Sequence, residues 1–454
     1  MLTVHTIKKI TKALSVSGNL SAVTKGVSIN SRTIEAGQLF IAIKGANFDG
    51  HDFIKDAVQK GAVAVVVSKQ IQCPDNIAVI RVDDTTKALG LIAAWHRRQF
   101  KIPVVAITGS AGKTTTKEMV AHVLGRKYNV LKNIGTENNQ FGVPLTLLKL
   151  DASHEIAVLE LGTNRPGDIS WLARITCPTI TIFTNIGESH LERLKTRSGV
   201  FREKSQLVKF MDPQGTIIFN NDDAYLPGLL KKRGQQTIIR FSCYNKAEYQ
   251  AADIRVENNQ RLRFTVKGWK FSLNTPAAHN IYNALSAISC GLASKIRYND
   301  IITALNRFKF QGGRQEVRKV GRFWLINDTY NANPVSFKSA VHTLDAMHIR
   351  GKKIIVCGDM LELGVRSKAL HETVGKVIAG STVKNVLAVG EKAKFITQTV
   401  NRLNPRLSAL HCPDLGEIQR QLADICRPGD AVLVKGSRGM HMERVVEYLE
   451  KLFK

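Results

Sequence analysis

Short apolar runs rich in β-branched residues alternate with helix-length amphipathic segments along most of this chain. The predicted strands lie at residues 62–67, 104–108, 157–161, 179–184, 216–220, 323–326, 353–357, 386–389 and 431–434. The predicted helices lie at residues 85–100, 114–126, 334–347 and 440–453. Continuously apolar strands are typical of sheets covered on both faces, and strands that alternate with helices are typical of parallel sheets. The pattern therefore predicts an α/β fold with largely parallel sheets.

The length of 454 residues is enough for about three domains, at roughly 150 residues each. Two segments are predicted boundaries. The run Lys-Ile-Pro at 101–103 separates a predicted helix from a new strand, and the turn-rich run Gln-Gly-Gly-Arg at 311–314 precedes another α/β segment. We therefore predict domains at residues 1–100, 101–312 and 313–454.

The chain carries a large excess of positive charge, because 65 Lys and Arg residues against 37 Asp and Glu residues give a net charge of +28. Such an excess is typical of proteins that bind nucleic acid or an anionic membrane surface. The three predicted domains, however, carry +6, +13 and +9, so the charge is spread over the chain. The densest run, at residues 231–233, has no aromatic residue of the kind that stacks on bases. The distribution disfavours a nucleic-acid partner.

Seven cysteines are scattered along the chain without a Cys-x-x-Cys pair or a His/Cys cluster at zinc spacing. This pattern is typical of reduced thiols in a cytosolic protein. The longest uncharged stretch, at residues 271–294, contains a proline, a histidine and several polar residues, which disfavours a membrane helix. The first residues lack the apolar core of a signal peptide. We expect a cytoplasmic protein without an integral membrane segment.

A glycine-rich loop follows the predicted strand at residues 104–108 and leads directly into a helix. Its residues are Thr108, Gly109, Ser110, Ala111, Gly112, Lys113, Thr114 and Thr115. Such a loop aims backbone N–H groups and a helix N-terminus at one point, which suits a polyphosphate. We expect Lys113 to reach the β- and γ-phosphates of ATP and the Thr114 hydroxyl to bind Mg²⁺. The alternative is a glycine-rich turn with a solvated lysine, and the strand–loop–helix context favours the nucleotide site.

Further motifs accompany this loop, among them Leu-Glu-Leu-Gly at 159–162 and Asp-Thr-Tyr-Asn-Ala-Asn-Pro at 328–334. With them, the chain from about residue 31 to 439 resembles the Mur ligase family, ATP-dependent amide-forming enzymes of peptidoglycan precursor synthesis. The resemblance implies an N-terminal UDP-sugar-binding domain, a central ATP-binding P-loop domain with a parallel sheet, and a C-terminal Rossmann-like domain. It also implies ATP and Mg²⁺ as cofactors.

Three side chains are candidate metal ligands besides Thr114. Glu160 ends a predicted strand, and a carboxylate at that edge of a parallel sheet faces the ligand crevice and suits Mg²⁺. The alternative is a strand-end carboxylate in a surface ion pair. The resemblance assigns Glu160 to Mg²⁺ and His190 to a second metal ion. It also aligns Lys204 with a lysine that several members carry as a carbamate, and only that modified form would bind Mg²⁺.

The resemblance implies four nucleotide-binding side chains outside the loop. Asn280 and Asn283 lie one turn apart at the start of a predicted helix and match the pair that holds adenine in the family. Asn280 as a helix cap is a compatible alternative. Arg314 matches an arginine that reaches the terminal phosphate from the domain joint, and Asp328 matches the ribose-binding aspartate.

The stretch Tyr-Asn-Ala-Asn-Pro at 330–334 looks like the branch of the family that adds D-alanyl-D-alanine, and the Asp-Asn-Pro-Arg motif of the diaminopimelate-adding branch is absent. The resemblance implies substrate-binding roles for Ser31, Arg32, Gly45, Asp49, His51, Asn138, Asn139, Tyr330, Asn331, Asn333 and Ser437. The motif around Ser31 begins with Asn30, where the family pattern has an aspartate.

We expect the carboxylate of UDP-N-acetylmuramoyl-tripeptide to be activated by ATP as an acyl phosphate, which the amine of D-alanyl-D-alanine then attacks. Lys113, His190, Lys204 and Arg314 are the expected catalytic residues, acting through positioning and charge neutralisation. We expect a monomer and no nucleic acid. Two alternatives stay open: a Mur ligase that adds a diamino acid to the dipeptide precursor, and a P-loop protein that binds nucleic acid.

Overall fold

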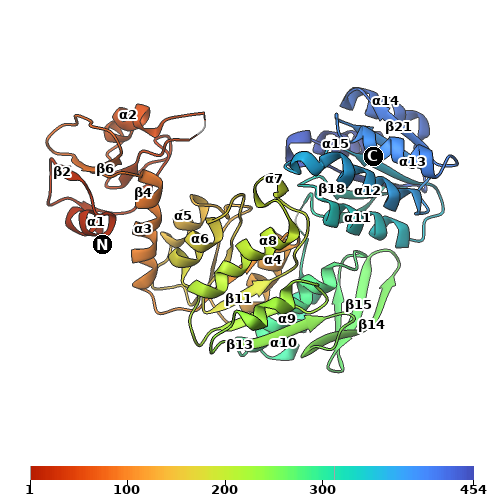
Figure 1. The fold of residues 1–454 in the computed structure, drawn as a ribbon, viewed down its shortest axis with the longest axis horizontal. Coiled ribbons are helices and arrows are strands. Elements are labelled where there is room, and N and C mark those ends of the chain that lie inside the picture. The colour runs from red at the N-terminus through yellow and green to blue at the C-terminus, as the bar shows by residue number, and fades with distance from the viewer. Residues whose placement is uncertain (1, 46, 311, 454) are drawn as a thin grey trace.

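The computed structural model describes residues 2–45, 47–310 and 312–453, and it contains three separate α/β units (Figure 1). The N-terminal unit, in red and orange, and the C-terminal unit, in blue, lie on either side of the central unit. Each unit has its own main sheet, and most strand pairs within these sheets are parallel. The predicted α/β fold is confirmed. Gln311 of the predicted joint lies outside the described residues.

The N-terminal unit has a five-stranded sheet in the order β2-β7-β6-β5-β4. Its strands are β2 (Ser15–Ser17), β4 (Val27–Ser28), β5 (Leu39–Ile41), β6 (Ala64–Val67) and β7 (Ala78–Arg81), and a separate pair is formed by β1 (Leu2–Thr3) and β3 (Val23–Thr24). Its helices are α1 (Val4–Thr11), α2 (Ile54–Gln59) and α3 (Thr85–Arg98). The strands β5 and β6 are fully buried because helices cover both faces of the sheet.

Helix α3 connects the N-terminal unit to the central one. The Asp84 side chain caps its first turn, accepting bonds from the backbone N–H groups of Thr86 and Lys87. At its other end the buried Arg97 donates from Nε to the carbonyl oxygen of Thr176 at 3.2 Å and from a terminal nitrogen to that of Ile102 at 2.9 Å. These bonds fix the helix against the central unit.

The central unit has a nine-stranded sheet in the order β16-β15-β14-β13-β12-β11-β8-β10-β9. Six strands form its parallel part: β8 (Val104–Thr108), β9 (Val130–Lys132), β10 (Ile156–Glu160), β11 (Ile180–Phe183), β12 (Thr216–Asn220) and β13 (Thr237–Ser242). An antiparallel part follows: β14 (Tyr249–Glu257), β15 (Arg261–Val266) and β16 (Trp269–Leu273). The strand β8 lies between β10 and β11, so the loop that follows it emerges near the middle of the sheet.

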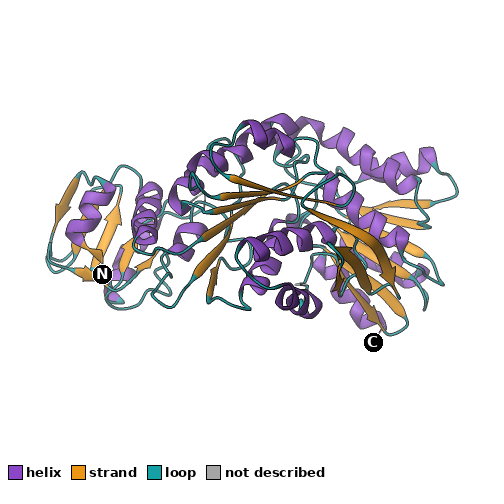
Figure 2. Ribbon diagram, turned by 90° about the horizontal axis from the view of Figure 1, so that it is seen from below, coloured by secondary structure: helices purple, strands orange, loops and turns teal. Residues whose placement is uncertain are grey.

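Helices pack on both faces of the central sheet (Figure 2). They are α4 (Lys113–Leu124), α5 (Gly142–Leu147), α6 (Asp168–Thr176), α7 (Leu191–Leu194), α8 (Arg197–Lys204), α9 (Asn280–Ala293) and α10 (Tyr298–Arg307). An apolar cluster lies on each face of the sheet. One cluster contains Leu159 and Phe219, and the other contains Ile107 and Phe241. Alternate residues of each strand therefore enter different clusters, which explains the continuous apolar runs.

The C-terminal unit has a six-stranded sheet in the order β17-β18-β22-β19-β20-β21. Its strands are β17 (Glu316–Val320), β18 (Phe323–Asp328), β19 (Lys353–Cys357), β20 (Asn385–Val389), β21 (Ser408–Cys412) and β22 (Ala431–Lys435). Its helices are α11 (Pro334–Ala346), α12 (Ser367–Ala379), α13 (Lys394–Leu403), α14 (Leu415–Ile425) and α15 (Glu443–Phe453). The edge pair β17–β18 of this sheet is antiparallel. The strands β18 and β22 are parallel neighbours, so their carboxyl ends lie side by side at one edge of the sheet.

All nine predicted strands are confirmed, three of them with the predicted bounds, and the four predicted helices differ from the structure by at most three residues at each end. The seven cysteines are free. No helix within the described ranges is both long and apolar enough to cross a membrane.

Candidate functional site

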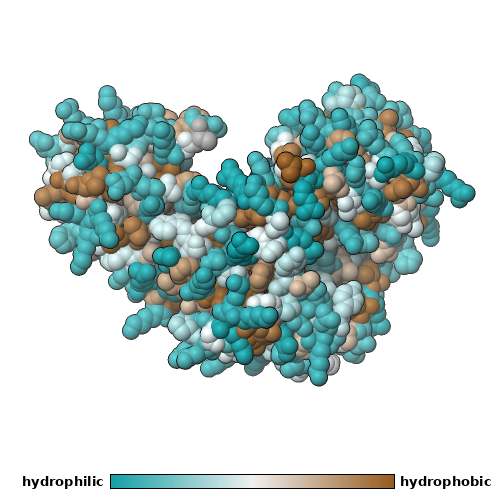
Figure 3. All heavy atoms as spheres, viewed as in Figure 1, coloured by the Kyte–Doolittle hydropathy of each residue, from teal (hydrophilic) through white to brown (hydrophobic). Residues whose placement is uncertain are grey.

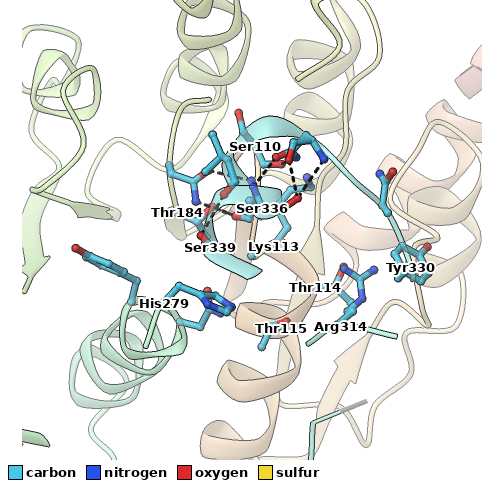
Figure 4. Close-up of a pocket in the computed structure, with 18 of the residues that line it drawn as sticks. Ser110, Lys113, Thr114, Thr115, Thr184, His279, Arg314, Tyr330, Ser336 and Ser339 are labelled. Atoms are coloured by element: carbon cyan, nitrogen blue, oxygen red, sulfur yellow. Dashed lines mark hydrogen bonds between the residues drawn. The ribbon is translucent and has the colours of Figure 1, made fainter. Parts of the chain in front are cut away.

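A cavity of about 520 Å³ lies between the central and C-terminal units, a volume typical of sites for small ligands. One wall is the loop after β8 together with the start of α9, and the other is formed by the ends of β18 and β22 and the start of α11. Figure 4 shows side chains from both units pointing into the same space. The surface view shows a separate hollow between the N-terminal and C-terminal units (Figure 3).

The loop at residues 108–115 has the backbone that a phosphate site requires. Gly109 and Gly112 have φ of 155° and 79°, and a Cβ atom at either position would lie 1.9 Å from Thr184 Oγ1 or 2.6 Å from Asn283 Oδ1. Glycine is therefore required at both positions. The loop is held from β11, since Asn185 Oδ1 accepts from the Ala111 N–H at 2.9 Å and Thr184 Oγ1 donates to the Ala111 carbonyl oxygen at 2.7 Å.

Two lysines lie close together beneath this loop. Lys113 starts α4 and donates from Nζ to the Gly109 carbonyl oxygen at 3.0 Å. Lys204 ends α8 and is 1% exposed. Burial lowers the pKa of both amines, and repulsion from Lys113 adds to the lowering at Lys204, whose pKa falls well below its ordinary value. At Lys204 this large lowering of the pKa increases the fraction of the amine that is neutral. Lys204 does not itself line the described cavity surface.

Glu160 ends β10 and is 1% exposed inside the cavity. Its Oε2 accepts from the Thr114 hydroxyl at 2.6 Å, and its Oε1 accepts from Asn138 Nδ2 at 2.7 Å. A carboxylate, a hydroxyl and an amide together offer the oxygen donors that Mg²⁺ prefers. No group of three His, Cys, Asp or Glu side chains forms a metal cluster among the described residues, so the set depends on Thr114 and Asn138 as well. The donor set fits Mg²⁺.

His190 lies at the mouth of the cavity and contacts the C-terminal unit. Its Nδ1 lies 2.8 Å from Oε2 of Glu362, and its backbone adopts a left-handed conformation with φ of 53°. Glu362 is also left-handed, with φ of 62°. Contact with His190 lowers the pKa of the Glu362 carboxyl. His190, the expected ligand of a second metal ion, therefore lies at a contact between the central and C-terminal units.

The start of α9 completes the wall of the cavity that the phosphate loop begins. Asn283 accepts from the Thr116 hydroxyl at 3.0 Å and donates from Nδ2 to Asn280 Oδ1 at 2.8 Å. Only Asn283 of this pair lines the cavity, so Asn280 lies behind it and orients it. His279 also lines the cavity, its buried Nδ1 has no partner among the described residues, and burial lowers its pKa to about 4.

The C-terminal wall carries Arg314, Asp328 and Tyr330. The guanidinium of Arg314 lies over the Tyr330 ring at 3.7 Å, which holds the cation toward the cavity (Figure 4). The Tyr330 hydroxyl donates to Thr136 Oγ1 of the central unit at 2.5 Å. Asp328 Oδ2 pairs at 2.6 Å with the fully buried Lys435, at the end of the neighbouring strand β22.

The other predicted substrate residues are divided between two regions. Asn138, Asn331 and Asn333 line the main cavity, whereas Asn139 lines an adjoining cavity of about 290 Å³ beside Arg165 and Trp171. Ser437 lies at the edge, where its hydroxyl oxygen accepts from the Leu361 N–H at 2.9 Å. Ser31, Arg32, Gly45, Asp49 and His51 all lie in the N-terminal unit, outside these cavities.

The N-terminal residues form a compact set of turns. Asp49 accepts from His51 Nδ1 at 2.5 Å and from Lys69 Nζ at 2.6 Å, and these contacts hold the pKa of Asp49 far below its ordinary value. His51 Nε2 accepts from the Ser68 N–H at 2.9 Å. Asn30 Oδ1 accepts from the Arg32 N–H at 2.9 Å, a turn that an aspartate would form equally well.

Sequence reasoning did not single out several cavity residues, namely Thr184, Asn185, Asp222, Tyr282, Gln315, Ser336, Ser339 and Lys435. Thr184 and Asn185 follow a predicted strand directly, and ends of neighbouring parallel strands meet at one sheet edge. Their position directly after a predicted strand was the sequence signal that could have identified them as site residues. Lys435 also directly follows a predicted strand, and its contact with Asp328 depends on β22 lying beside β18.

Three models of the Mur ligase family match nearly the whole chain. The family's catalytic domain matches residues 23–97, its middle domain matches 107–291, and its glutamate ligase domain matches 313–438. The chain belongs to the Mur ligase family. The resemblance drawn from the motifs is thereby confirmed, and with it the three-part Mur ligase architecture.

Similar proteins cover this Mur ligase from end to end. UDP-N-acetylmuramoyl-tripeptide–D-alanyl-D-alanine ligase from Bacillus subtilis (strain 168) is 34% identical over 98% of both chains, and that from Escherichia coli (strain K12) is 33% identical over 94% and 93%. MurF from Acinetobacter baumannii has a TM-score of 0.90 at 30% identity, over 99% and 98%. MurF ligase from Thermotoga maritima, in complex with ADP, has a TM-score of 0.85 at 28% identity, over 95% and 98%.

Proposed function

We propose that this chain is an ATP-dependent ligase that joins D-alanyl-D-alanine to UDP-N-acetylmuramoyl-tripeptide, with ADP and phosphate as the other products. The proposal assigns UDP-sugar binding to residues 1–100, ATP binding to residues 101–312 and closure of the ATP site to residues 313–454. The chain is proposed to act as a monomer in the cytoplasm, without nucleic acid.

One observation carries this proposal. The loop at residues 108–115 and the stretch at 328–334 face each other across one cavity. The Tyr330 hydroxyl in that stretch donates a hydrogen bond to Thr136, which lines the same cavity. A phosphate-binding loop alone would fit many nucleotide-binding proteins. The Tyr-Asn-Ala-Asn-Pro stretch directly opposite narrows the function to the branch that adds D-alanyl-D-alanine, and the names of the full-length relatives support the same branch.

In the proposed reaction the terminal carboxylate of the tripeptide attacks the γ-phosphorus of ATP, and the bond between that phosphorus and the ADP oxygen breaks. The amine of D-alanyl-D-alanine then attacks the acyl carbon, loses a proton and expels phosphate. Lys113 and Arg314 lie on opposite walls of the cavity, where their charges would balance the charge moving to the terminal phosphate. Tyr330 orients Arg314, and both walls together exclude water from the acyl phosphate.

Thr114, Glu160 and Asn138 are the residues proposed to hold Mg²⁺, and His190 is proposed to bind a second metal ion. A bound Mg²⁺ would neutralise phosphate charge and polarise the terminal phosphorus. The lowered pKa of Lys204 favours reaction of its amine with CO₂, which gives a carbamate and releases a proton, and the carbamate oxygens would extend the ligand set. Asn283, oriented by Asn280, is proposed to hold adenine, and Asp328 is proposed to bind the ribose.

Phosphate release tests the proposal with the purified chain, ATP, Mg²⁺ and UDP-N-acetylmuramoyl-tripeptide. We expect turnover to require D-alanyl-D-alanine. A diamino acid in its place should not support turnover, and added RNA should not change the rate. Lys113→Ala removes the charge at the phosphate loop and should lower turnover at least a hundredfold. Turnover driven by the diamino acid on the dipeptide precursor, or full activity of the Lys113→Ala variant, would contradict the proposal.

A further inference from the structure

A lysine is completely buried in helix α4, one turn after Lys113. The side chain of Lys117 is 0% exposed, and a buried lysine is rare unless its charge is paired. Its Nζ lies 3.1 Å from Oε1 of Glu118, whose other carboxylate oxygen contacts Lys132. Because Lys132 already supplies a cation for Glu118, the ion pair alone does not explain the burial of a second lysine at position 117.

The other bonds of Lys117 go to the loop at residues 133–138, which follows β9. Its Nζ donates to the carbonyl oxygens of Asn133 at 2.6 Å and Gly135 at 2.9 Å. An ammonium group has three N–H donors, and these two oxygens together with Glu118 occupy all of them. Lys117 does not line the main cavity. Any effect of Lys117 on the site is therefore transmitted through the loop.

The same loop holds Glu160 by both its backbone and its carboxylate. The pairing of β9 with β10 ends at Lys132 and Val158. Beyond that pair, the buried Asn133 side chain accepts from the Glu160 N–H at 2.9 Å and donates to the Glu160 carbonyl oxygen at 3.1 Å. At the far end of the loop, Asn138 Nδ2 donates to the Glu160 carboxylate at 2.7 Å. The loop therefore fixes both the end of the strand and the direction of its carboxylate.

These contacts form a closed ring that begins and ends on α4. Lys117 holds the loop, the loop holds Glu160, and Glu160 accepts from the hydroxyl of Thr114 in the first turn of the same helix. Thr114, Lys117 and Glu160 are all buried, so water does not easily replace these bonds. The position of the Glu160 carboxylate beside the Thr114 hydroxyl therefore depends on Lys117.

We propose that Lys117 is a positioning residue for the binding of Mg²⁺, an inference that rests on the proposed function. By holding the loop at residues 133–138, Lys117 keeps Glu160 beside Thr114, the two residues that bring a carboxylate and a hydroxyl to the proposed Mg²⁺ site. Residues behind the direct ligands of a metal ion orient those ligands, and the loss of one weakens metal binding by about 10- to 100-fold. A lysine with only a structural role would affect stability and leave metal binding unchanged.

Electron paramagnetic resonance of Mn²⁺, used in place of Mg²⁺ with the full chain and ADP, tests this without any amine substrate. Lys117→Met keeps the length of the side chain and removes its donors, and we expect it to bind Mn²⁺ about tenfold more weakly than the parent chain. ADP binding without a divalent cation should be unchanged, because the loop at residues 108–115 is intact. In turnover assays, the Mg²⁺ concentration that gives half the maximal rate should rise by the same factor, whereas kcat at saturating Mg²⁺ should change little.

Lys132→Met is the matched control, because it removes the other cation that contacts Glu118 and leaves the bonds of Lys117 to the loop in place. Its Mn²⁺ affinity should match that of the parent. Asn133→Ala breaks the link to Glu160 itself, so it should weaken Mn²⁺ binding as Lys117→Met does, and it serves as the test if Lys117→Met does not fold.

Parental Mn²⁺ affinity in folded Lys117→Met or Asn133→Ala, even with lower thermal stability, would overturn the proposal, and so would equal weakening in the control. The ligase function is tested separately by the amine. If Mn²⁺ binding changes as expected but turnover does not require D-alanyl-D-alanine, the proposed ligase function is wrong and the role of Lys117 in metal binding stands.

Discussion

Lys204 and Lys113 show how burial, rather than residue type, sets the chemistry of an amine. An exposed lysine is protonated at neutral pH and repels a metal ion. Lys204 is almost completely buried and lies close enough to Lys113 for their repulsion to lower its pKa further. The lowered pKa increases the neutral fraction of this amine, and the neutral form is the one that reacts as a nucleophile. This property is what makes the proposed carbamate at Lys204 chemically reasonable.

Carbamate formation at Lys204 can be observed directly. In ¹³C-bicarbonate buffer we expect one protein-bound carbamate carbonyl signal, which should be absent in Lys204→Arg because a guanidinium does not form the adduct. The control is the parent chain in bicarbonate of natural isotopic abundance, which should give no such signal. If the signal persists in the arginine variant, the carbamate lies at another lysine, and if the parent chain gives no signal, Lys204 is unmodified.

His279 predicts a loss of stability at mildly acidic pH. Burial lowers its pKa from 6.5 to about 4 in the folded chain, so the unfolded chain binds a proton first as the pH falls. The free energy of unfolding should therefore decrease between pH 6.5 and 4, by up to about 3 kcal/mol from this group. Chemical denaturation at several pH values measures this. His279→Gln removes the titrating group and should weaken the dependence on pH, and an unchanged slope would contradict the assignment.

Local chemistry was predictable at the phosphate loop because the loop residues are contiguous and each has a recognisable task. Gly109 and Gly112 permit the left-handed backbone, and Lys113 and Thr114 follow at fixed positions. Thr184 and Asn185 were missed because their contact with the loop depends on β11 lying beside β8, which is a property of the sheet order rather than of the local sequence.

At the scale of elements, α3 depends on one glycine in its middle. Gly90 lies against α6, and a Cβ atom there would lie 2.5 Å from a ring carbon of Trp171. Alanine in place of glycine normally stabilises an exposed helix by about 1 kcal/mol. Here the ring blocks the methyl group, so the contact between the N-terminal and central units must give way.

We expect Gly90→Ala to lower the free energy of unfolding by roughly 1–3 kcal/mol, the usual cost of overpacking a tight contact. Equilibrium urea denaturation measures the change. Gly380→Ala is the matched control, because a Cβ atom at the end of α12 meets its nearest atoms at 3.8 Å. The control should be neutral or slightly stabilising. A stable Gly90→Ala variant would show that α3 and α6 can separate without cost.

The sequence predicted nine strands of the parallel sheets, and it missed β14, β15 and β16 as well as other parallel strands such as β5 and β9. Strands such as β8 and β19 are buried on both faces, so their apolar runs are visible without knowledge of partners. In β15 only alternate residues are buried, as in the run Arg-Leu-Arg-Phe-Thr-Val at 261–266. That alternation was a signal for a half-exposed strand, but the charged residues interrupt the apolar run on which the strand predictions depended.

At the scale of the whole molecule, a shared apolar cluster that includes Leu191 and Leu363 joins the C-terminal unit to the central one, and a few polar contacts add to it. His190 meets Glu362, and Tyr330 meets Thr136. Farther from the cavity, Asn259 in the turn between β14 and β15 donates to the His348 carbonyl oxygen at 2.7 Å and accepts from the His348 N–H at 2.8 Å. Each of these hydrogen bonds is worth about 1 kcal/mol, so removing two of them should shift the balance toward an open arrangement.

The double variant N259A/E362Q should favour an open arrangement. We expect a larger radius of gyration by X-ray scattering without ligands and a several-fold higher KM for ATP, whereas kcat should change little once the site is closed. Adding ATP with the tripeptide should return the radius toward that of the parent. Identical scattering curves for the parent and the variant would show that other contacts hold the units together.

The arrangement of the units was only partly accessible from sequence. The turn-rich joint and the segment after α3 indicated where one sheet ends and another begins, so the proposed boundaries follow from local signals. The contacts of His190 with Glu362 and of Asn259 with His348 join residues 172 and 89 positions apart. Pairing over such distances depends on how whole units dock, which local patterns do not encode.

Helix α3 has a consequence for which acceptors the proposed ligase tolerates. Its 14 residues span about 21 Å, and Arg97 prevents it from pivoting against the central unit. The helix thereby fixes the distance between the proposed UDP-sugar site in the N-terminal unit and the phosphate loop before substrate binds. Each peptide residue adds at most about 3.5 Å to an extended stem. We therefore expect this fixed distance to select acceptors by the length of their peptide stem.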